Sequence, residues 1–440
     1  MYRIVLCVVA LATAMPVAQA QESVRDELKK LQERVKELEG RVQDAENTAS
    51  QAAAQASSRP QTESALNPGV SVILNGVYAN LSRDPASYRI NGFVPTMGEV
   101  APPTRGFSLG ESELAFMANI DHMFRGTLIA SISPDNDAIG VEEGYIQTLA
   151  LPRGFTVKAG RFFSAIGYQN QIHAHAWDFT DAPLANKVFL GNQLNEDGIQ
   201  LKWVASTSFY WDVGVEAGRG RQFPAAAGAA GPRNKNGVSS GNVFTHVGGD
   251  FGTGTAWQTG VSYLSTSPQD RTFEDSTGTT NSFTGQSRLW VLDGILKWAP
   301  NYNPTYTNFK LQGEYFRRKE DGNLTFDTTG TAQTGGFTSV QSGWYLQSVY
   351  QFVPMWRVGY RYDRLNSGTT NLSAPLAAAD FPILAAYNPT KHTVMIDWSP
   401  SEFSRVRLQA ASDKSRSDVT DHQVFLQYIV SLGAHGAHKF

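Results

Sequence analysis

The chain has 440 residues, of which 41% are hydrophobic and only 18% are charged, and its formal net charge at neutral pH is −3. A net charge this small excludes a general polycationic surface, so nucleic acid is not an expected partner. The single cysteine, Cys7, leaves no partner for a disulfide and no cysteine-based metal site. Few charges together with 40 glycines and 11% aromatic residues favour a chain whose segments alternate between two environments.

Residues 1–20 have the pattern of a secretory signal peptide. Arg3 gives a positive start, residues 4–15 form an apolar stretch, and Ala18-Gln19-Ala20 is a small-x-small cleavage site. A membrane anchor is disfavoured because a spanning helix needs ~20 apolar residues. No later apolar run is long enough to predict an ordinary helical membrane protein.

Residues 21–56 form the one region with a clear helical pattern. Apolar residues recur there at alternating spacings of four and three, namely Val24, Leu28, Leu31, Val35, Leu38 and Val42, and Ala45, Ala49, Ala52 and Ala56 continue the register. This heptad seam predicts a periplasmic coiled coil and hence a homo-oligomer. An amphipathic helix that packs on its own domain is the alternative. Residues 57–68 read as a polar linker with prolines.

From residue 69 onward, short alternating runs are separated by clusters of Gly, Asn, Asp, Ser and Pro. We expect sixteen strands, over residues 70–82, 108–120, 122–133, 139–151, 154–163, 196–206, 208–218, 243–252, 255–265, 288–299, 305–318, 339–353, 355–364, 390–399, 402–413 and 419–432. The connections after even-numbered strands are short, and those after odd-numbered strands are mostly long, including 83–107, 164–195, 219–242, 266–287, 319–338 and 365–389. This asymmetry is typical of outer-membrane barrels, which have short periplasmic turns and long outer loops.

Apolar and charged residues separate onto two faces of the expected strands. Val406 and Leu408, for example, oppose Arg405, Arg407 and Asp413. A water-filled barrel needs this arrangement because an outward charge costs ~2–4 kcal/mol at mid-membrane. Aromatic residues near strand ends predict interfacial girdles: Trp203, Trp257, Trp298, Tyr302, Tyr306, Trp344, Trp356 and Trp398. The predicted fold is all-β: a 16-stranded antiparallel transmembrane β-barrel at 69–440, preceded by the coiled coil.

The last strand resembles the C-terminal signature of outer-membrane barrels, because alternating apolar residues up to Leu432 are followed by a terminal Phe440. Residues 433–438 interrupt the alternation, so the strand could end near Leu432 or continue to Phe440.

Three short motifs resemble the phosphate-selective porin family of Gram-negative bacteria. They are Glu143-Gly144-Tyr145-Ile146, the run from Phe155 to Phe163 that ends in Gly160-Arg161-Phe162-Phe163, and Gly167-Tyr168. The resemblance implies a homotrimer whose third loop, here 164–195, folds into each pore, and lumen cations that guide anions. The residues that would take this role are Lys158, Arg161, Lys202, Arg357, Arg361, Arg405 and Arg407.

The opposing interpretation is that these cations are ordinary lumen charges, balanced by Glu143, Asp293, Glu314 and Asp363. A charged-ring filter requires one sign to dominate, and the lumen predicted here is mixed, which favours the balanced interpretation.

The third loop departs from the family by carrying His173-x-His175 with Asp178 nearby, and His435 and His438 form a second pair. Such residues suit zinc or another ion that prefers imidazole, and they also occur as plain polar loop residues. No cofactor is expected apart from such a zinc ion. The two pairs are expected on opposite sides of the membrane, which argues against one shared site.

The sequence therefore favours a passive outer-membrane channel for small hydrophilic or anionic solutes, including ions. The expected partners are outer-membrane lipid, further copies of the chain, small solutes and the machinery that inserts outer-membrane barrels. A zinc-linked receptor or uptake channel using the loop histidines, and a structural tether, are the alternatives. Hydrolase, Walker and zinc-protease motifs are lacking in the sequence, so an enzyme is not expected.

Overall fold

The computed structural model describes residue 30 and residues 69–96, 100–132, 139–226, 236–275 and 277–433. The expected signal peptide, coiled coil and linker, apart from Lys30, lie outside these residues, as do His435, His438 and Phe440. Among the residues described, no helix is long and apolar enough to cross a membrane.

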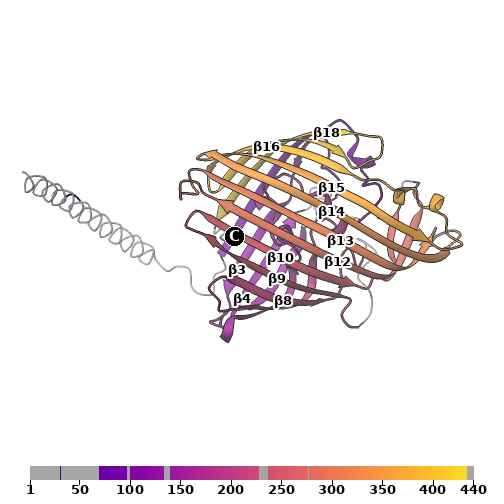
Figure 1. Ribbon diagram of the computed structural model, residues 1–440, viewed down its shortest axis with the longest axis horizontal. Helices are drawn as coiled ribbons and strands as arrows, with labels where there is room; N and C mark the ends of the chain where they lie inside the picture. The colour runs from indigo at the N-terminus through magenta and orange to yellow at the C-terminus, as the bar shows by residue number, and fades with distance from the viewer. Residues whose placement is uncertain are drawn as a thin grey trace, which may run out of the picture. The chain divides into compact units, whose positions relative to one another are not determined.

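The described elements are mostly strands (Figure 1). In chain order the strands are β1 (Gly69–Leu81), β2 (Gly106–Leu109), β3 (Ser112–Asn119), β4 (Phe124–Ile132), β5 (Ile139–Thr148), β6 (Phe155–Phe163), β7 (Asn195–Val204), β8 (Tyr210–Gly218), β9 (Ser240–Phe251), β10 (Thr255–Thr266), β11 (Arg271–Glu274), β12 (Thr280–Trp298), β13 (Asn308–Phe326), β14 (Gln333–Val353), β15 (Trp356–Leu372), β16 (Thr390–Ser401), β17 (Ser404–Lys414) and β18 (Asp421–Gly433). The helical elements are η1 (Pro85–Ser87), η2 (Pro152–Gly154), η3 (Gln169–Gln171), η4 (Ala174–Ala176), α2 (Leu184–Leu190), η6 (Ala378–Asp380) and η7 (Pro382–Leu384).

The strands close into one antiparallel barrel. β2 and β3 both pair with β1, and β10 and β11 both pair with β12, so each of these two pairs is a single interrupted strand. The 18 described strands therefore amount to 16 barrel strands, and β1 pairs with β18 to close the ring. The predicted all-β, 16-stranded antiparallel barrel is confirmed, and β18 ends at Gly433 within the described residues.

Four strands on one side are longer than the sequence suggested. β12, β13, β14 and β15 have 19, 19, 21 and 17 residues, although ~9–11 residues cross a membrane. The expected loops 266–287 and 319–338 are thus largely strand, and that part of the loop-length prediction was wrong. Outward positions in these extensions, such as Lys319 and Asp321, are polar, so the apolar alternation that marks a strand is lost there.

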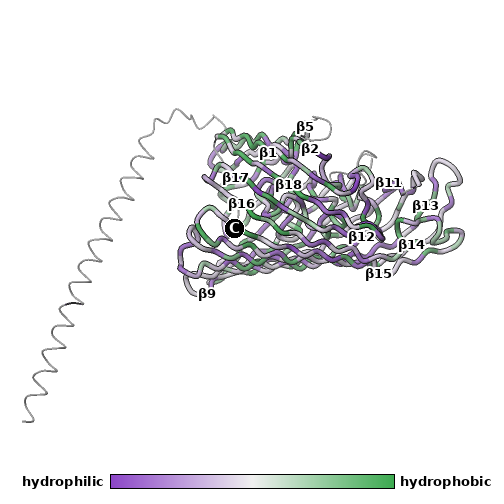
Figure 2. Tube along the Cα trace, turned by 90° about the horizontal axis from the view of Figure 1, so that it is seen from above, coloured by the Kyte–Doolittle hydropathy of each residue, from purple (hydrophilic) through white to green (hydrophobic). Residues whose placement is uncertain are grey.

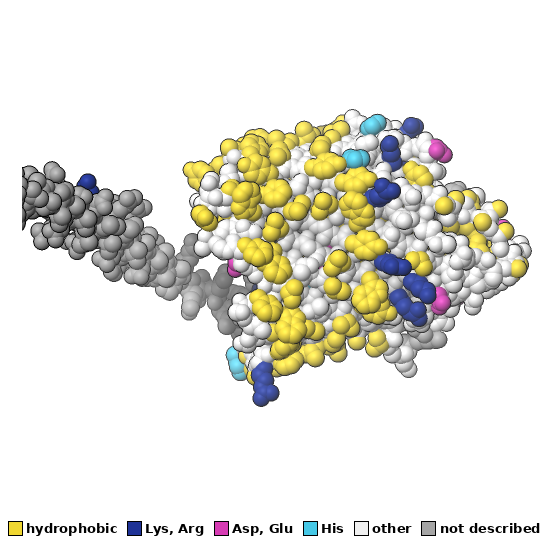
Figure 3. All heavy atoms as spheres, in the orientation of Figure 1, with side chains coloured by type: hydrophobic (Ala, Val, Ile, Leu, Met, Phe, Trp, Pro, Cys, Tyr) yellow, Lys and Arg dark blue, Asp and Glu magenta, His cyan; other side chains and the backbone are white. Residues whose placement is uncertain are grey.

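Hydropathy changes along the strands (Figure 2), and the side chains alternate between an exposed outer face and the lumen. On β15, Val358 and Tyr360 are exposed, whereas Arg361 and Asp363 are buried inside the barrel. In Figure 3 apolar side chains cover much of the barrel toward the end with the short turns, a row of basic side chains follows, and the protruding end shows both apolar and other side chains. This is the surface expected of a barrel with an apolar belt.

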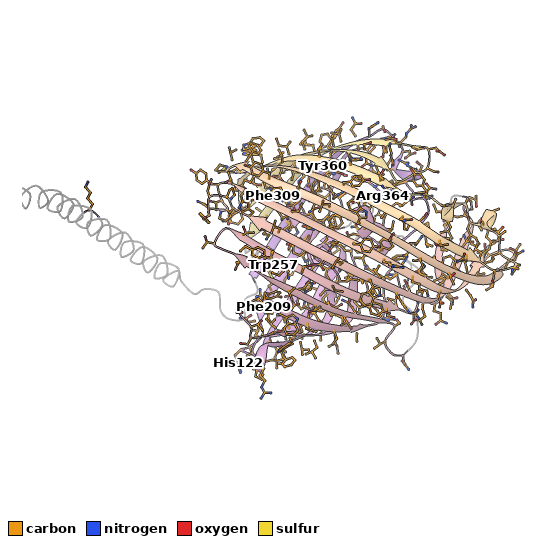
Figure 4. All side chains as sticks on the ribbon, viewed as in Figure 1. His122, Phe209, Trp257, Phe309, Tyr360 and Arg364 are labelled. Carbon is orange, nitrogen blue, oxygen red and sulfur yellow. The ribbon has the colours of Figure 1, made fainter. Side chains whose placement is uncertain are left out.

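Aromatic residues mark the short-turn edge of this belt. Trp356 and Trp398 lie opposite one another on β15 and β16, with ring centroids 6.0 Å apart. Figure 4 labels Phe209, Trp257 and Phe309 toward the same end of the barrel, and Tyr360 and Arg364 farther along it. Trp344 is the exception to the predicted position at a strand end, because it lies in the middle of β14, where it packs on Tyr362.

Loops fill the lumen toward the end of the barrel from which β12–β15 protrude, which is called the long-strand end below. The segment between β6 and β7 runs inside the barrel, and every residue of its helix α2 is buried. α2 packs on β13, β14 and β15, and the resulting apolar cluster includes Phe189 of the helix, Phe93 of the first loop and Phe316 of the wall. A second cluster joins Phe381 and Ile383 of a later loop to Phe283 and Phe337. The barrel interior is therefore packed at this level rather than open across its full width.

Candidate functional site

The segment between β6 and β7, residues 164–194, is called the lumen loop below. Two carboxylates of the wall hold its first residues: Glu216 of β8 accepts hydrogen bonds from Ser164 and Ala165, and Glu314 of β13 binds the residues that follow. Oε1 of Glu314 accepts hydrogen bonds from the backbone nitrogens of Tyr168 and Gln169, at 2.5 and 3.0 Å. Gly167 has a φ of +67°, and a Cβ at this position would lie 2.6 Å from the same Oε1 atom. The Gly-Tyr motif is thus a tight entry into the lumen that only glycine fits.

The glycine of the Gly160-Arg161-Phe162 motif has a similar steric role in β6. Its φ is +130°, and a Cβ there would lie 2.3 Å from the carbonyl oxygen of Gly144 on β5. Both motif glycines therefore allow close backbone approach where the wall meets the lumen loop.

His173 and His175 lie beside the barrel wall, among glutamates of β3 and β5. Nδ1 of His175 lies 2.6 Å from Oε1 of Glu113, and Nδ1 of His173 lies 3.2 Å from Oε2 of the same carboxylate. Oε2 of Glu142 is 3.3 Å from that His173 atom, and Oε2 of Glu143 is 3.0 Å from Nε2 of His173. Burial alone would lower the pKa of His173, but these glutamates hold it well above its ordinary value.

Asp178 does not join the histidines, although the sequence suggested a shared metal site. It forms an ion pair with Lys310 of β13, and its Oδ1 accepts a hydrogen bond from Arg357 of β15 at 3.1 Å. Burial would raise the pKa of Asp178, but these two cations outweigh burial and hold it far below its usual range. Asp178 therefore anchors the middle of the loop to the opposite wall.

Asp181 is the most heavily paired carboxylate of the lumen loop. It lies 2.9 Å from Arg361 of β15, 2.7 Å from Lys391 of β16 and 3.7 Å from Lys187 of α2. Burial would raise its pKa, but Lys391 and Arg361 lower it well below the ordinary value. Burial lowers the pKa of Lys187 to about 8, against the attraction of Asp181.

Acid is expected to leave the lumen loop docked until the pH falls well below about 4. Because the pKa of Asp181 is lower in the folded protein, its stabilisation is complete above the unfolded pKa and is lost only as the pH falls through the folded pKa. Protease cleavage within the loop, followed between about pH 7 and pH 4, should stay constant. A release with its midpoint at about pH 5–6 would contradict this assignment.

Two arginines of β17 also bind the loop. Arg405 donates to the carbonyl oxygen of His175, and Arg407 donates to that of Trp177 at 2.8 Å and to Asp397 at 3.3 Å. These guanidinium groups are tied to loop backbone and carboxylate rather than presented to passing solute.

Cavities lie toward both ends of the lumen loop. One cavity, of about 600 Å³, lies toward the short turns and is lined by Tyr168 and Ile172 of the loop and by Trp257 of β10. A neighbouring cavity of about 470 Å³ shares Asp250 and Ala256 with it. A third, about 290 Å³, lies toward the long-strand end, between Leu190 of the loop and Gly140 of the wall. The loop thus lies between cavities near the two ends of the barrel.

The two cavities at the short-turn end are called the basic vestibule. Their combined lining holds five basic side chains and two carboxylates: Lys158, Lys202, Lys297, Lys310 and Arg357, with Asp212 and Asp250. His246 also lines the vestibule and lies 2.8 Å from Asp212, a buried pair. Lys310 and Arg357 are ion-paired with Asp178, as described above, so the excess of positive charge at this end of the lumen is small.

The structure places six of the seven predicted pore cations in the lumen. Arg161 differs: it lies directly opposite Asp197 of β7, on the same face as Ile199 and Leu201, which are exposed on the outer surface. It pairs with Asp197 at 2.6 Å. Lys158 and Arg161 are three residues apart, so they cannot share a face of a regular strand.

Several residues of the site were not found from the sequence. Lys310 of the vestibule, and Glu113 and Glu142 beside the histidines, were not singled out. Lys310 alternates with apolar Phe309 and Leu311, which was the available signal, whereas Glu113 follows Ser112 and Glu142 precedes Glu143, so alternation does not mark these two glutamates. Nothing in a single sequence indicates which of these strands face the lumen loop.

The chain was compared with protein-family models, with known protein sequences and with solved structures. No family model matches the chain. An uncharacterized protein of Aquifex aeolicus is 30% identical over 402 residues, which cover 87% of this chain and 81% of that protein. Among solved structures, the trimer form of OmpT, an outer membrane protein of Vibrio cholerae, has a TM-score of 0.51 at 11% identity, covering 83% of this chain and 99% of that chain.

OprB of Pseudomonas putida has a TM-score of 0.50 at 11% identity and covers 83% of this chain and 94% of that chain. At such identities the likeness extends to the barrel fold alone. The chain belongs to the same family as the Aquifex aeolicus protein, and it has the 16-stranded barrel fold seen in proteins of the bacterial outer membrane.

Proposed function

We propose that this protein is a passive diffusion channel of the Gram-negative outer membrane for small hydrophilic solutes, with a preference for anions. The observation that carries this proposal is the lumen loop, which is folded inside the barrel and has cavities toward both of its ends. A loop fixed inside a barrel narrows the passage, and the charge beside it selects among solutes.

The anion preference rests on the basic vestibule rather than on the whole set of predicted cations. Arg361 and Arg407 are within 3.3 Å of carboxylates, so their field on a passing solute is largely cancelled. Lys202 and Lys297 line the vestibule near one end of the path and would attract anions into it. Membership of the phosphate-selective porin family, suggested by the motifs at 143–168, is part of the same proposal, as is assembly into trimers.

The proposal is tested by recording from purified protein in planar bilayers. We expect discrete conductance steps, closure in three equal steps if the unit is a trimer, and a reversal potential in a salt gradient that favours anions. Lack of any conductance from folded protein would overturn the channel function and leave a structural role.

Replacing Lys202 and Lys297 together with glutamine should move the reversal potential toward the value for no selectivity, because the two changes remove positive charge from the vestibule. The matched control is Lys319→Gln, since Lys319 is exposed on the outer face of β13 and outside the lumen. An unchanged reversal potential in the double variant would refute the role of the vestibule.

The zinc-linked alternative draws support from the placement of His173 and His175 near three glutamates. These residues fasten the loop to the wall, which fits a structural ion better than a transported one. The tether alternative depends on residues 21–56, which lie outside the described part of the chain.

A further inference from the structure

The contacts of the two loop histidines are not fully explained by hydrogen bonds. Nδ1 of His173 and Oε2 of Glu142 are buried and meet no partner in good hydrogen-bond geometry. They nevertheless lie 3.3 Å apart, and Oε2 of Glu113 lies 3.2 Å from the same nitrogen. Unsatisfied buried polar atoms are rare and call for a ligand or another physical cause.

Ligand-type atoms of Glu113, His173 and His175 all lie within 4.8 Å of one another. A metal ion bound at ~2.1 Å by imidazole nitrogen and carboxylate oxygen holds its ligands roughly 3–3.5 Å apart, so a small side-chain adjustment is enough to enclose one ion. The two rings are stacked, with centroids 5.7 Å apart and an interplanar angle of 26°, and both turn Nδ1 toward Glu113.

The surroundings of His173 also match those of a metal ligand. Its second ring nitrogen, Nε2, is 3.0 Å from Oε2 of Glu143, whose other oxygen accepts the backbone N–H of Phe163 at 3.0 Å. A metal-binding histidine ordinarily donates its other ring N–H to such a carboxylate, which fixes the tautomer and the ring orientation.

An entry route is present as well. Glu111 and Glu142 line the cavity of about 290 Å³ at the long-strand end, and together with Glu113 they form a second close group of carboxylates. The glutamates around His173 and His175 therefore outnumber the two histidines, and their negative charge attracts a cation.

We propose that Glu113, His173 and His175 bind one divalent transition-metal ion of the zinc class, with Glu142 as a fourth ligand and Glu143 orienting His173. Imidazole with carboxylate suits Zn²⁺ and its neighbours better than Mg²⁺ or Ca²⁺, which prefer oxygen ligands alone. Because the histidines belong to the lumen loop and the glutamates to β3 and β5, the ion cross-links the loop to the wall. The proposal that these residues bind a metal does not depend on the proposed channel function. Only the expected effect of the metal on conductance rests on that function.

The test is Zn²⁺ titration by calorimetry of the full chain, folded in detergent and freed of metal with a chelator. We expect one equivalent of zinc bound in the lumen, no comparable binding of Mg²⁺, and loss of this equivalent in the His173→Ala/His175→Ala double variant. His122→Ala is the matched control, because His122 is exposed in a short turn (Figure 4). His435→Ala/His438→Ala removes the other histidine pair and should leave the equivalent in place.

Glu143→Gln gives a graded readout: it should weaken zinc binding ~10–100-fold without changing its stoichiometry, as loss of an orienting carboxylate does. If the double variant does not fold, Co²⁺ added to the unchanged protein decides, since nitrogen and oxygen ligands give a visible absorption band that free Co²⁺ lacks at that intensity. Full zinc binding by the folded double variant, or no such Co²⁺ band, overturns the site.

Single-channel recording separates this inference from the channel itself. Chelation should raise the conductance of the unchanged protein and leave that of the double variant unaltered. Zinc bound as predicted by a protein without conductance would support the metal site and overturn the channel.

Discussion

Replacing Asp181 with asparagine is expected to release the lumen loop from the wall. The neutral amide can still accept a hydrogen bond, but it no longer neutralises Arg361, Lys391 and Lys187, all of which are buried. Breaking a buried ion pair on one side costs ~3–5 kcal/mol, and we expect a value near the lower limit because Arg361 keeps Asp363 and Lys391 keeps Asp413.

Two measurements check this expectation: single-channel conductance, which should rise, and protease cleavage within residues 164–194, which should accelerate. Asp418→Asn is the matched control because Asp418 is an exposed loop carboxylate. Normal conductance and normal protease resistance in folded Asp181→Asn protein would show that other contacts hold the loop.

Replacing Glu320 with glutamine should destabilise the long-strand end by about 3–5 kcal/mol. Glu320 and Arg271 form a bidentate pair, with distances of 2.7 and 3.1 Å, and their side chains are 0% and 1% exposed. Arg271 also lies over the rings of Phe223 and Phe283, and Arg318 is 3.9 Å from Glu320. Loss of the carboxylate leaves two buried guanidinium groups without their shared anion.

The matched comparison for Glu320 is the double variant Arg271→Met/Glu320→Met. Removing both charges leaves less uncompensated charge than removing one, so the double variant should unfold in urea closer to the unchanged protein than Glu320→Gln does. Equal or greater destabilisation of the double variant would mean that packing of the Arg271 side chain, rather than charge, dominates at this position.

The sequence located the strands well where lipid-facing residues are apolar. β17 was expected at 402–413 and is found at Ser404–Lys414, since Val406 and Leu408 mark the outer face there. Apolar alternation did not reveal the outer halves of β12–β15. Beyond the apolar belt, the positions on the outer face carry polar residues such as Lys319, so the alternation disappears there. Alternation reports the environment of a strand as much as its conformation.

The candidate site could be predicted only in part, for a related reason. Inward cations such as Arg361 follow from strand parity, but their partners do not. Asp181 and Arg361 are 180 residues apart in the chain, and no local pattern links them. Asp178 was assigned to the histidines by proximity in sequence, whereas the turn of the loop after Trp177 carries it to Lys310 and Arg357 instead.

The protruding strands leave β15 with a free edge. Its pairing with β16 stops at Arg364, whereas its pairing with β14 continues to Leu372, so residues 366–372 have a strand on one side only among the described residues. Unpaired strand edges invite pairing with a neighbouring molecule, a hazard in a crowded membrane. The residues of this edge are polar. The pairing of β15 with β14 is bulged between Val340 and Ser342 of β14, and Gly368 in the edge has a φ of +60°. A bulged, polar edge is a poor template for sheet extension, so adjacent barrels are protected from joining edge to edge.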